Sequence, residues 1–368
     1  MSGGFLSPLF LMGLGVVGTY VSPPPVIADV GFVNGVYVQV TVTDYNGTPL
    51  GELGAGVESV TWKLNEIGRA RLGVGNPGTA DELMQFGNRV LIEFDNGLPD
   101  WAGYLDTPRR WRYGSVALTA YSGEGLLAQR VTDRGRYFRK ATVGAILKAL
   151  LLEQAGPAVV ELGSVWLDGL PHSPSYHFKS LLQVVQDSLL RMEAADFDVT
   201  GHIENGRLRL RANFYERKGF DLPGVALLEG HNVNVGEPEE QGEIVNEWFL
   251  AGGGTGWGAE SRIYATARDE ESIYKYGLRQ GAEVLSGVSV QETLDGHAVV
   301  RLAESAAPYF SLPLTAINLA PARFAEYGVG DGVWIELYSY FEDGYSGMRR
   351  VIGREFRPSS GGCTVMVV

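Results

Sequence analysis

The chain has 368 residues, which is enough for two or three domains with substantial cores. Acidic residues outnumber basic ones by 43 to 30, so the formal net charge is −13, and the chain would repel nucleic acid unless its basic residues were gathered in one patch. Fifty residues are glycine without any strict period, which excludes a collagen-like or low-complexity chain and favours many short strands joined by tight turns. The single cysteine, Cys363, can form neither an internal disulfide nor a metal site.

The first 28 residues carry no charged side chain, and residues 5–21 form an apolar run. A secretory signal would begin with Lys or Arg, and Pro8 with several glycines interrupts any spanning helix, so we expect no stable membrane insertion. We expect residues 1–34 to be an arm that binds a neighbouring subunit; the alternatives are that it covers the chain's own first barrel or enters a membrane. The expected interface residues are Phe5, Leu6, Leu9, Phe10, Leu11, Met12, Leu14, Val16 and Val17.

Residues 35–131 are predicted to form a first small β-barrel. Apolar and polar residues alternate as in half-buried strands, and Asn-Gly pairs at 46–47 and 96–97 supply tight turns between them. We expect Pro108 to end one strand, because proline cannot donate a hydrogen bond to a neighbouring strand. The predicted strands are 36–42, 57–64, 70–74, 89–94, 101–106 and 115–121.

Residues 132–245 have a different pattern and are predicted to form an α+β middle domain. Thr142 can cap a helix that runs to Gln154, and a second helix is expected from Lys179 to Ala194, since apolar residues recur at helical spacing in both. A hairpin is expected to follow, with strands 197–202 and 207–212.

Residues 246–368 are predicted to form a second β-barrel with short helical insertions, and their last part repeats the first barrel. GNRVLIE at 87–93 aligns with GDGVWIE at 330–336. In each copy a glycine precedes a proline by five residues, and we expect these residues, Gly103 with Pro108 and Gly353 with Pro358, to be structural turn positions. The fold class is therefore mainly β with α+β insertions, in which two related small β-barrels flank a mixed helix and hairpin middle.

This arrangement resembles a known family. Two small barrels around a mixed middle, with AYSGEGLLAQR after the first and YGVGDGVWIELYSYFEDGYSGMRRVIGREFRP in the second, are similar to the baseplate-hub proteins of tailed bacteriophages and contractile injection systems. The resemblance covers roughly residues 35–368. It implies a ring-forming structural protein at the end of the tail tube, and it brings no catalytic residue with it.

The densest basic cluster is Arg109, Arg110 and Arg112, which surround Trp111. Arginine beside tryptophan can bind single-stranded nucleic acid by stacking. Three charges in an acidic chain favour a solvated strand edge or a subunit contact instead.

No set of residues has the spacing of a catalytic or metal site. The five histidines are scattered, and His172 and His177 lie five residues apart without a cysteine partner. The glycine-rich segment 252–258 lacks the Lys-Ser/Thr pair of a phosphate-binding loop. We therefore expect no catalytic residue, no cofactor and no metal.

The resemblance thus implies a structural virion protein made in the host cytoplasm and located at the tail tip, a hub that closes the distal end of the tail tube, connects it to host-recognition components and provides the channel for DNA ejection. The expected partners are its own copies in a homotrimeric ring, the distal tail or tube protein, the tape measure, fibre or spike proteins, and DNA that passes without specific binding. The alternatives are a glycan- or peptidoglycan-degrading tail enzyme and a carbohydrate-binding β-sandwich protein.

Overall fold

The computed structural model describes residues 36–75, 78, 81–132, 135–155, 159–169, 171–187, 195–237, 239–254, 262–285, 288–311, 313–339 and 344–368. The protein is 51% strand and 16% helix, which confirms the mainly β fold class. The predicted arm, with its interface residues between Phe5 and Val17, lies outside the described residues. Within the described ranges, no helix is both long and apolar enough to cross a membrane.

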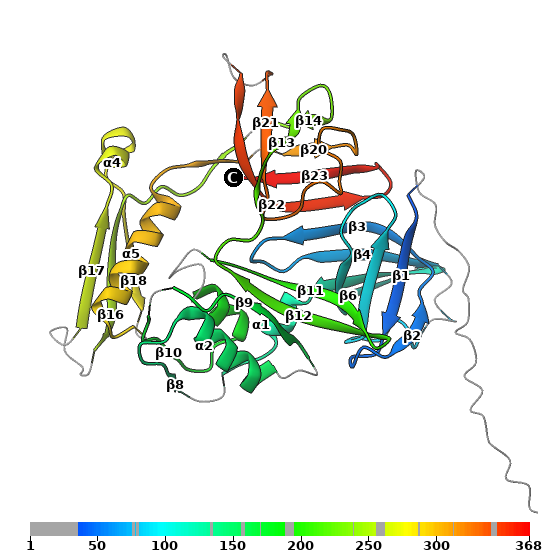
Figure 1. Ribbon diagram of the computed structural model, residues 1–368, viewed down its shortest axis with the longest axis horizontal. Coiled ribbons are helices and arrows are strands. Elements are labelled where there is room, and N and C mark those ends of the chain that lie inside the picture. Colours follow the sequence, from blue (N-terminus) through cyan, green and yellow to red (C-terminus); the bar gives the residue numbers. More distant parts are fainter. Residues whose placement is uncertain are drawn as a thin grey trace, which may run out of the picture.

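Thirteen strands from both ends of the chain form one sheet, drawn in blue and cyan and in green to red in Figure 1. These strands are β1 (Val38–Thr43), β2 (Pro49–Glu52), β3 (Ala55–Lys63), β4 (Arg69–Gly75), β5 (Arg89–Phe94), β6 (Trp101–Arg112), β7 (Ser115–Ser122), β13 (Asp221–Leu228), β14 (Val233–Val235), β20 (Leu314–Ala316), β21 (Gly332–Leu337), β22 (Tyr345–Arg357) and β23 (Gly362–Val367).

The two β-rich ends are joined because β22 pairs with β3, with Gly353 opposite Lys63 and Phe356 opposite Val60. Each end keeps its own apolar core: strands β1 and β3 to β7 enclose one, and strands β13, β14 and β20 to β23 enclose the other. No closed barrel was found among the described strands. One shared sheet over both cores therefore connects the two ends of the chain, and Trp62 and Phe94 pack against both cores.

The repeated segments are both antiparallel meanders, β5-β6-β7 and β21-β22-β23, as their matching patterns predicted. The expectation that Gly103 and Gly353 are turn residues was wrong, because both lie inside the central strand of their meander. A Cβ atom at Gly103 would lie 2.1 Å from the Tyr121 carbonyl oxygen, and one at Gly353 would lie 2.8 Å from Met366 Cε. These glycines permit close packing of neighbouring groups on a strand.

The two prolines differ in position. Pro108 does not end its strand as expected, because β6 continues through it to Arg112, and the register shifts between Asp106 and Arg110. A strand irregularity is one of the places where a missing backbone N–H is tolerated. Pro358 begins the turn that connects β22 to β23.

The middle of the chain forms a small α+β layer. Its helices and strands are α1 (Glu124–Ala128), α2 (Val143–Leu150) with a π-helical turn (Leu151–Ala155), α3 (Leu181–Val185), β8 (Arg136–Tyr137), β9 (Glu161–Val165), β10 (Ser175–Tyr176), β11 (Asp196–Glu204) and β12 (Arg207–Tyr215). Thr142 caps α2 as predicted, and Ser180 caps α3 in a reciprocal capping box with Gln183. The predicted second helix is described only to residue 187.

The helices pack on one face of the β9–β11–β12 sheet. That face carries Phe197, Val199, Leu208 and Leu210, and its core extends to Leu91 and Ala102 of the first β unit. Because side chains alternate along a strand, the opposite face carries the polar residues of the same hairpin. Asp196 on this polar face contacts both β-rich ends, whereas the apolar face packs against the first of them.

A further unit packs beside this body, on the left of Figure 1. Its elements are β16 (Glu247–Gly254), β17 (Arg262–Arg268), β18 (Gln280–Leu285), α4 (Glu270–Tyr276) and α5 (Gln291–Ser305), and the short pair β15 (Glu239–Gln241) and β19 (Tyr309–Ser311) lies next to it in sequence. Helix α5 covers the three-stranded sheet with a small core of its own. The domain boundaries at 131/132 and 245/246 stay predictions.

Candidate functional site

The candidate site is a polar junction at the start of β11, where three parts of the chain meet. Asn65 reaches it from the loop after β3, Glu124 from α1 and Arg350 from β22, while β11 itself belongs to the middle layer. These contacts join residues more than 70 positions apart in the sequence. Junctions of this kind fix how separate cores sit relative to one another.

Asp196 is the centre of the junction and is 1% exposed. Its carboxylate accepts hydrogen bonds from Asn65 Nδ2 at 3.0 Å and from the Lys218 backbone N–H at 2.7 Å, and it pairs with Arg350 Nη2. Arg350 also donates Nε to the Gly330 carbonyl at 3.0 Å. The buried charge of Asp196 is therefore compensated by three donors from three segments.

Asn65 adopts a positive φ of 62°, a conformation that asparagine tolerates better than most residues. The turn directs its amide towards β11, where Oδ1 accepts the Phe197 backbone N–H at 2.7 Å. One side chain thus satisfies both a donor and an acceptor at the first two residues of the strand.

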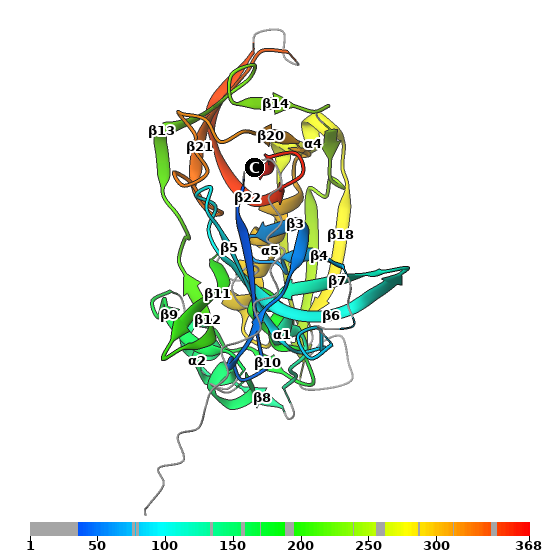
Figure 2. The same ribbon diagram turned by 90° about the vertical axis from the view of Figure 1, so that its right-hand side faces the viewer.

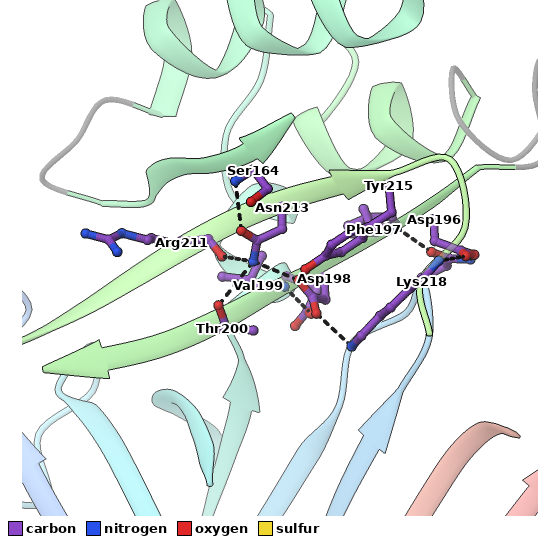
Figure 3. Close-up of polar contacts among 12 residues, drawn as sticks. Ser164, Asp196, Phe197, Asp198, Val199, Thr200, Arg211, Asn213, Tyr215 and Lys218 are labelled. Atoms are coloured by element: carbon purple, nitrogen blue, oxygen red, sulfur yellow. Dashed lines mark hydrogen bonds and ion pairs between the residues drawn. The ribbon is translucent and has the colours of Figure 1, made fainter. Parts of the chain in front are cut away.

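A second network continues along the polar face of the hairpin (Figure 3). Asn213 Nδ2 donates to Asp198 Oδ1 at 2.9 Å and to Thr200 Oγ1 at 3.1 Å, and Lys218 Nζ lies 2.7 Å from Asp198 Oδ2. The Tyr215 hydroxyl also donates to Asp198, and burial, helped by this carboxylate, raises the pKa of Tyr215. The acids of this face act as hydrogen-bond acceptors within the fold.

Glu124 is a fully buried carboxyl group at the same junction. Its Oε1 accepts the Val199 backbone N–H at 2.8 Å, whereas Oε2 is buried and makes no hydrogen bond to any residue in the described ranges. Burial raises the pKa of Glu124 from 4.5 to about 7, although hydrogen bonds from Ser122 and from backbone N–H groups lower it. This carboxyl group therefore holds its proton into the neutral range.

A cavity of about 440 Å³ lies beside these residues and is lined by all three parts of the chain, including Trp62, Trp101, Thr200, Lys218 and Asp331. The Trp101 indole donates to the Thr61 carbonyl at 3.1 Å. Both oxygens of Asp331 accept backbone N–H groups, of Phe220 at 2.9 Å and of Gly328 at 2.7 Å. The Trp101 indole and the Asp331 carboxylate in the cavity wall thus form hydrogen bonds within the fold.

A cluster that the sequence analysis missed lies further along the same face. The ligand atoms of Glu161, His202 and Glu204 lie within 4.8 Å of one another, because β9 pairs with β12 and brings Glu161 beside the hairpin. Two arginines balance these carboxylates: Arg209 lies 3.5 Å and Arg211 3.3 Å from Glu161. Burial, helped by the charge of Arg211, lowers the pKa of His202 and favours its neutral form.

His172 and His177, which the sequence analysis considered, do not take part in this junction, and neither does His231. His172 is buried and its backbone pairs with Ala141, while the exposed His177 ring packs edge-on against Tyr137. His231 Nε2 lies 3.0 Å from the Ala320 carbonyl oxygen at the surface. The structure therefore does not bring His172 and His231 to a shared site.

We expect that His172→Ala and His231→Ala variants assemble and function normally, with only modest loss of stability, because neither histidine belongs to the group of possible metal ligands found among the described residues. Thermal melts and an ejection or plaque assay check this. A variant that assembles normally but is inactive would reveal a functional site at that histidine.

Solved structures of several tail proteins have the same architecture as this chain. The prophage MuSo2 43 kDa tail protein from Shewanella oneidensis matches with a TM-score of 0.55 at 13% identity, over 90% of this chain and 98% of the other. The prophage tail protein gp18 from Listeria monocytogenes EGD-e matches with a TM-score of 0.52 at 12% identity, over 89% and 94%. The chain has the fold of prophage tail proteins.

The tail protein from Neisseria meningitidis MC58 has the same fold, with a TM-score of 0.59 and 14% identity over 90% of this chain and 95% of that one. No family model matches the chain, and no curated protein matches its sequence. The resemblance inferred from the strand patterns is therefore confirmed at the level of the fold, by similarity of structure and not of sequence.

Proposed function

We propose that this protein is a structural component of a bacteriophage-type tail, a hub that forms a homotrimeric ring at the distal end of the tail tube. The observation that supports it most is the match of about nine-tenths of the chain to three tail proteins, each of which is itself covered almost completely. A match over whole chains supports a shared architecture better than one shared module would.

The parts of the chain are firmly connected, as expected for a structural component that bears mechanical load. One sheet joins the two β-rich ends through β22 and β3, and the Asp196 junction fixes the middle layer against both of them. Extended hydrogen bonding and buried polar networks resist relative movement of the parts. Such a body keeps its shape when neighbouring proteins of the tail pull on it.

The proposed partners are further copies of the chain, the distal tail or tube protein, the tape measure, and fibre or spike proteins. In this role the hub closes the tube and later provides the channel through which DNA leaves. The formal net charge of −13 supports passage of DNA without specific binding, since like charges repel.

The proposal predicts that purified virions contain this chain and that deleting its gene yields particles with unfinished or absent tails. Mass spectrometry of virions and electron microscopy of the deletion mutant test both. Normal infectious particles without the chain would contradict a structural role.

We further expect that deleting residues 1–25 leaves the remaining chain folded but weakens its assembly into the tail. Residues 5–21 carry no charge, and at roughly 25 cal/mol per Å² even partial burial of this run on a neighbour would contribute several kcal/mol. Thermal melts and virion incorporation of the truncated and full chains separate the outcomes. Normal assembly would show that the arm is dispensable, and failure to fold would show that it belongs to the chain's own core.

A further inference from the structure

An exposed basic surface lies on the sheet face opposite the first core. In the pairing of β4 with β7, Arg71 lies opposite Thr119, and in the pairing of β7 with β6, Ala117 lies opposite Arg110. Thr119 and Ala117 are two residues apart on β7, so the two arginines project from the same face. Arg69, two residues before Arg71, joins them there.

These three guanidinium groups are exposed, and none of them forms an ion pair with a residue in the part of the chain that the structure describes. They line a hollow of about 200 Å³ together with Pro108 and Glu58. Three positive charges against one negative charge leave an uncompensated excess on this face. We call Arg69, Arg71 and Arg110 the arginine surface.

The arginine surface lies on a part of the sheet that extends outward. Figure 2 shows the β6–β7 hairpin at the edge of the molecule, and Arg69, Arg71 and Arg110 are all exposed there. At the end of this hairpin Tyr113 is fully exposed and Trp111 is 60% exposed, although Trp111 pairs with Val116 and therefore projects from the face opposite Arg110. Tryptophan, tyrosine and arginine are the residue types that most often dominate protein interfaces.

Building on the proposed ring, we propose that the arginine surface docks against carboxylate side chains of a second copy of this chain. Arginine suits this role because its planar guanidinium binds a carboxylate through two parallel hydrogen bonds. A second copy supplies the matching charge, since the chain has 43 acidic and 30 basic residues. A ring contact joins two unlike surfaces of the subunit, so the arginine surface of one copy can face carboxylates on a different surface of the next.

A nucleic acid is the less suitable occupant. The acidic chain repels a polyanion as a whole, and the Glu58 carboxylate stands in the hollow beside the arginines. The hollow holds a few side-chain groups, whereas non-specific binding to a strand needs a basic groove that follows the backbone. Ion pairs with a few carboxylates of a neighbouring protein are compatible with the acidic character of the chain and with the small size of the hollow.

The test uses the full chain with an Arg71→Glu/Arg110→Glu double variant. Both residues are exposed and unpaired within the described structure, so the variant should fold with a melting temperature near that of the wild type. A matched control is Arg207→Glu/Arg323→Glu, which reverses two exposed arginines outside the arginine surface. Each double variant exchanges two positive charges for two negative ones, so the variant and the control carry the same net charge, and comparing them separates local from global effects.

Sedimentation equilibrium gives the association constant of each protein at about 50 and 500 mM salt. We expect the double variant to associate roughly 10- to 100-fold more weakly than the control at low salt, and the difference to shrink at high salt. Equal association of the variant and control would overturn the proposal. So would binding of single-stranded DNA by the wild type that the double variant loses, because the surface would then serve nucleic acid.

The same data keep this proposal apart from the proposed function. A wild type that stays monomeric at every concentration would contradict self-assembly into a ring and this interface with it. A wild type that assembles regardless of the charge reversal would contradict only the arginine surface.

Discussion

Replacing Asp196 with alanine should lower the free energy of unfolding by about 3–5 kcal/mol, which is the usual cost of removing one partner from a buried ion pair. The substitution leaves Arg350, whose side chain is 25% exposed, without its carboxylate, and it leaves Asn65 Nδ2 and the Lys218 N–H without their acceptor. Urea denaturation at pH 7 measures the loss.

A double-mutant cycle with Arg350→Ala measures the interaction energy between Asp196 and Arg350 apart from their contacts with other residues. If the two side chains act on each other, the Asp196→Ala/Arg350→Ala protein should be clearly more stable than the sum of the two single losses implies. Strictly additive losses would show that the junction is held by other contacts. Asp221→Ala is a suitable control, because its pairing with Arg217 is solvent-exposed and should contribute little.

Replacing Glu124 with glutamine should stabilise the protein at pH 8 by up to about 3 kcal/mol and have little effect at pH 4.5. Burial raises the pKa of this carboxyl from 4.5 to about 7, so the folded state binds its proton more tightly than the unfolded state does. Stability is therefore lost as the pH rises from about 4.5 to 7, and the cost of ionising the buried group is complete above that range.

Glutamine is nearly isosteric, carries no charge and keeps an oxygen for the Val199 N–H, so it removes this cost while the contact remains. Denaturation curves at both pH values for the wild type, Glu124→Gln and the exposed control Glu82→Gln test the sign. A gain that is the same at both pH values, or a loss at pH 8, would contradict a buried neutral carboxyl at this position.

Local structure followed from local pattern. The two meanders, the caps at Thr142 and Ser180 and the β11–β12 hairpin arise from alternation, turn residues and capping residues that act within a few positions. The same local pattern marks Gly103 and Gly353, but the turn role predicted for them is wrong. Close approach of Tyr121 to Gly103 depends on which strand becomes the neighbour, and spacing along the chain does not contain that information.

The junction could not be predicted from spacing. Asn65 and Asp196 are 131 residues apart, and Asp196 and Arg350 are 154 apart, so no short motif links them. Two single residues gave a weak signal. Asn65 lies three positions before Gly68, as in a turn, and Asp196 stands at the start of a predicted strand. The pairing of β22 with β3 brings Arg350 and Asn65 to one region, and β11, which belongs to another sheet, adds Asp196 to it.

The most direct test of the central claim is electron microscopy of virions that carry a compact tag at the C-terminus of this chain, decorated with a tag-specific antibody fragment. The account predicts label only at the distal end of the tail, with averaged views that show a three-fold ring. Label on the capsid or along the whole tail, or absence of the chain from purified virions, would contradict it.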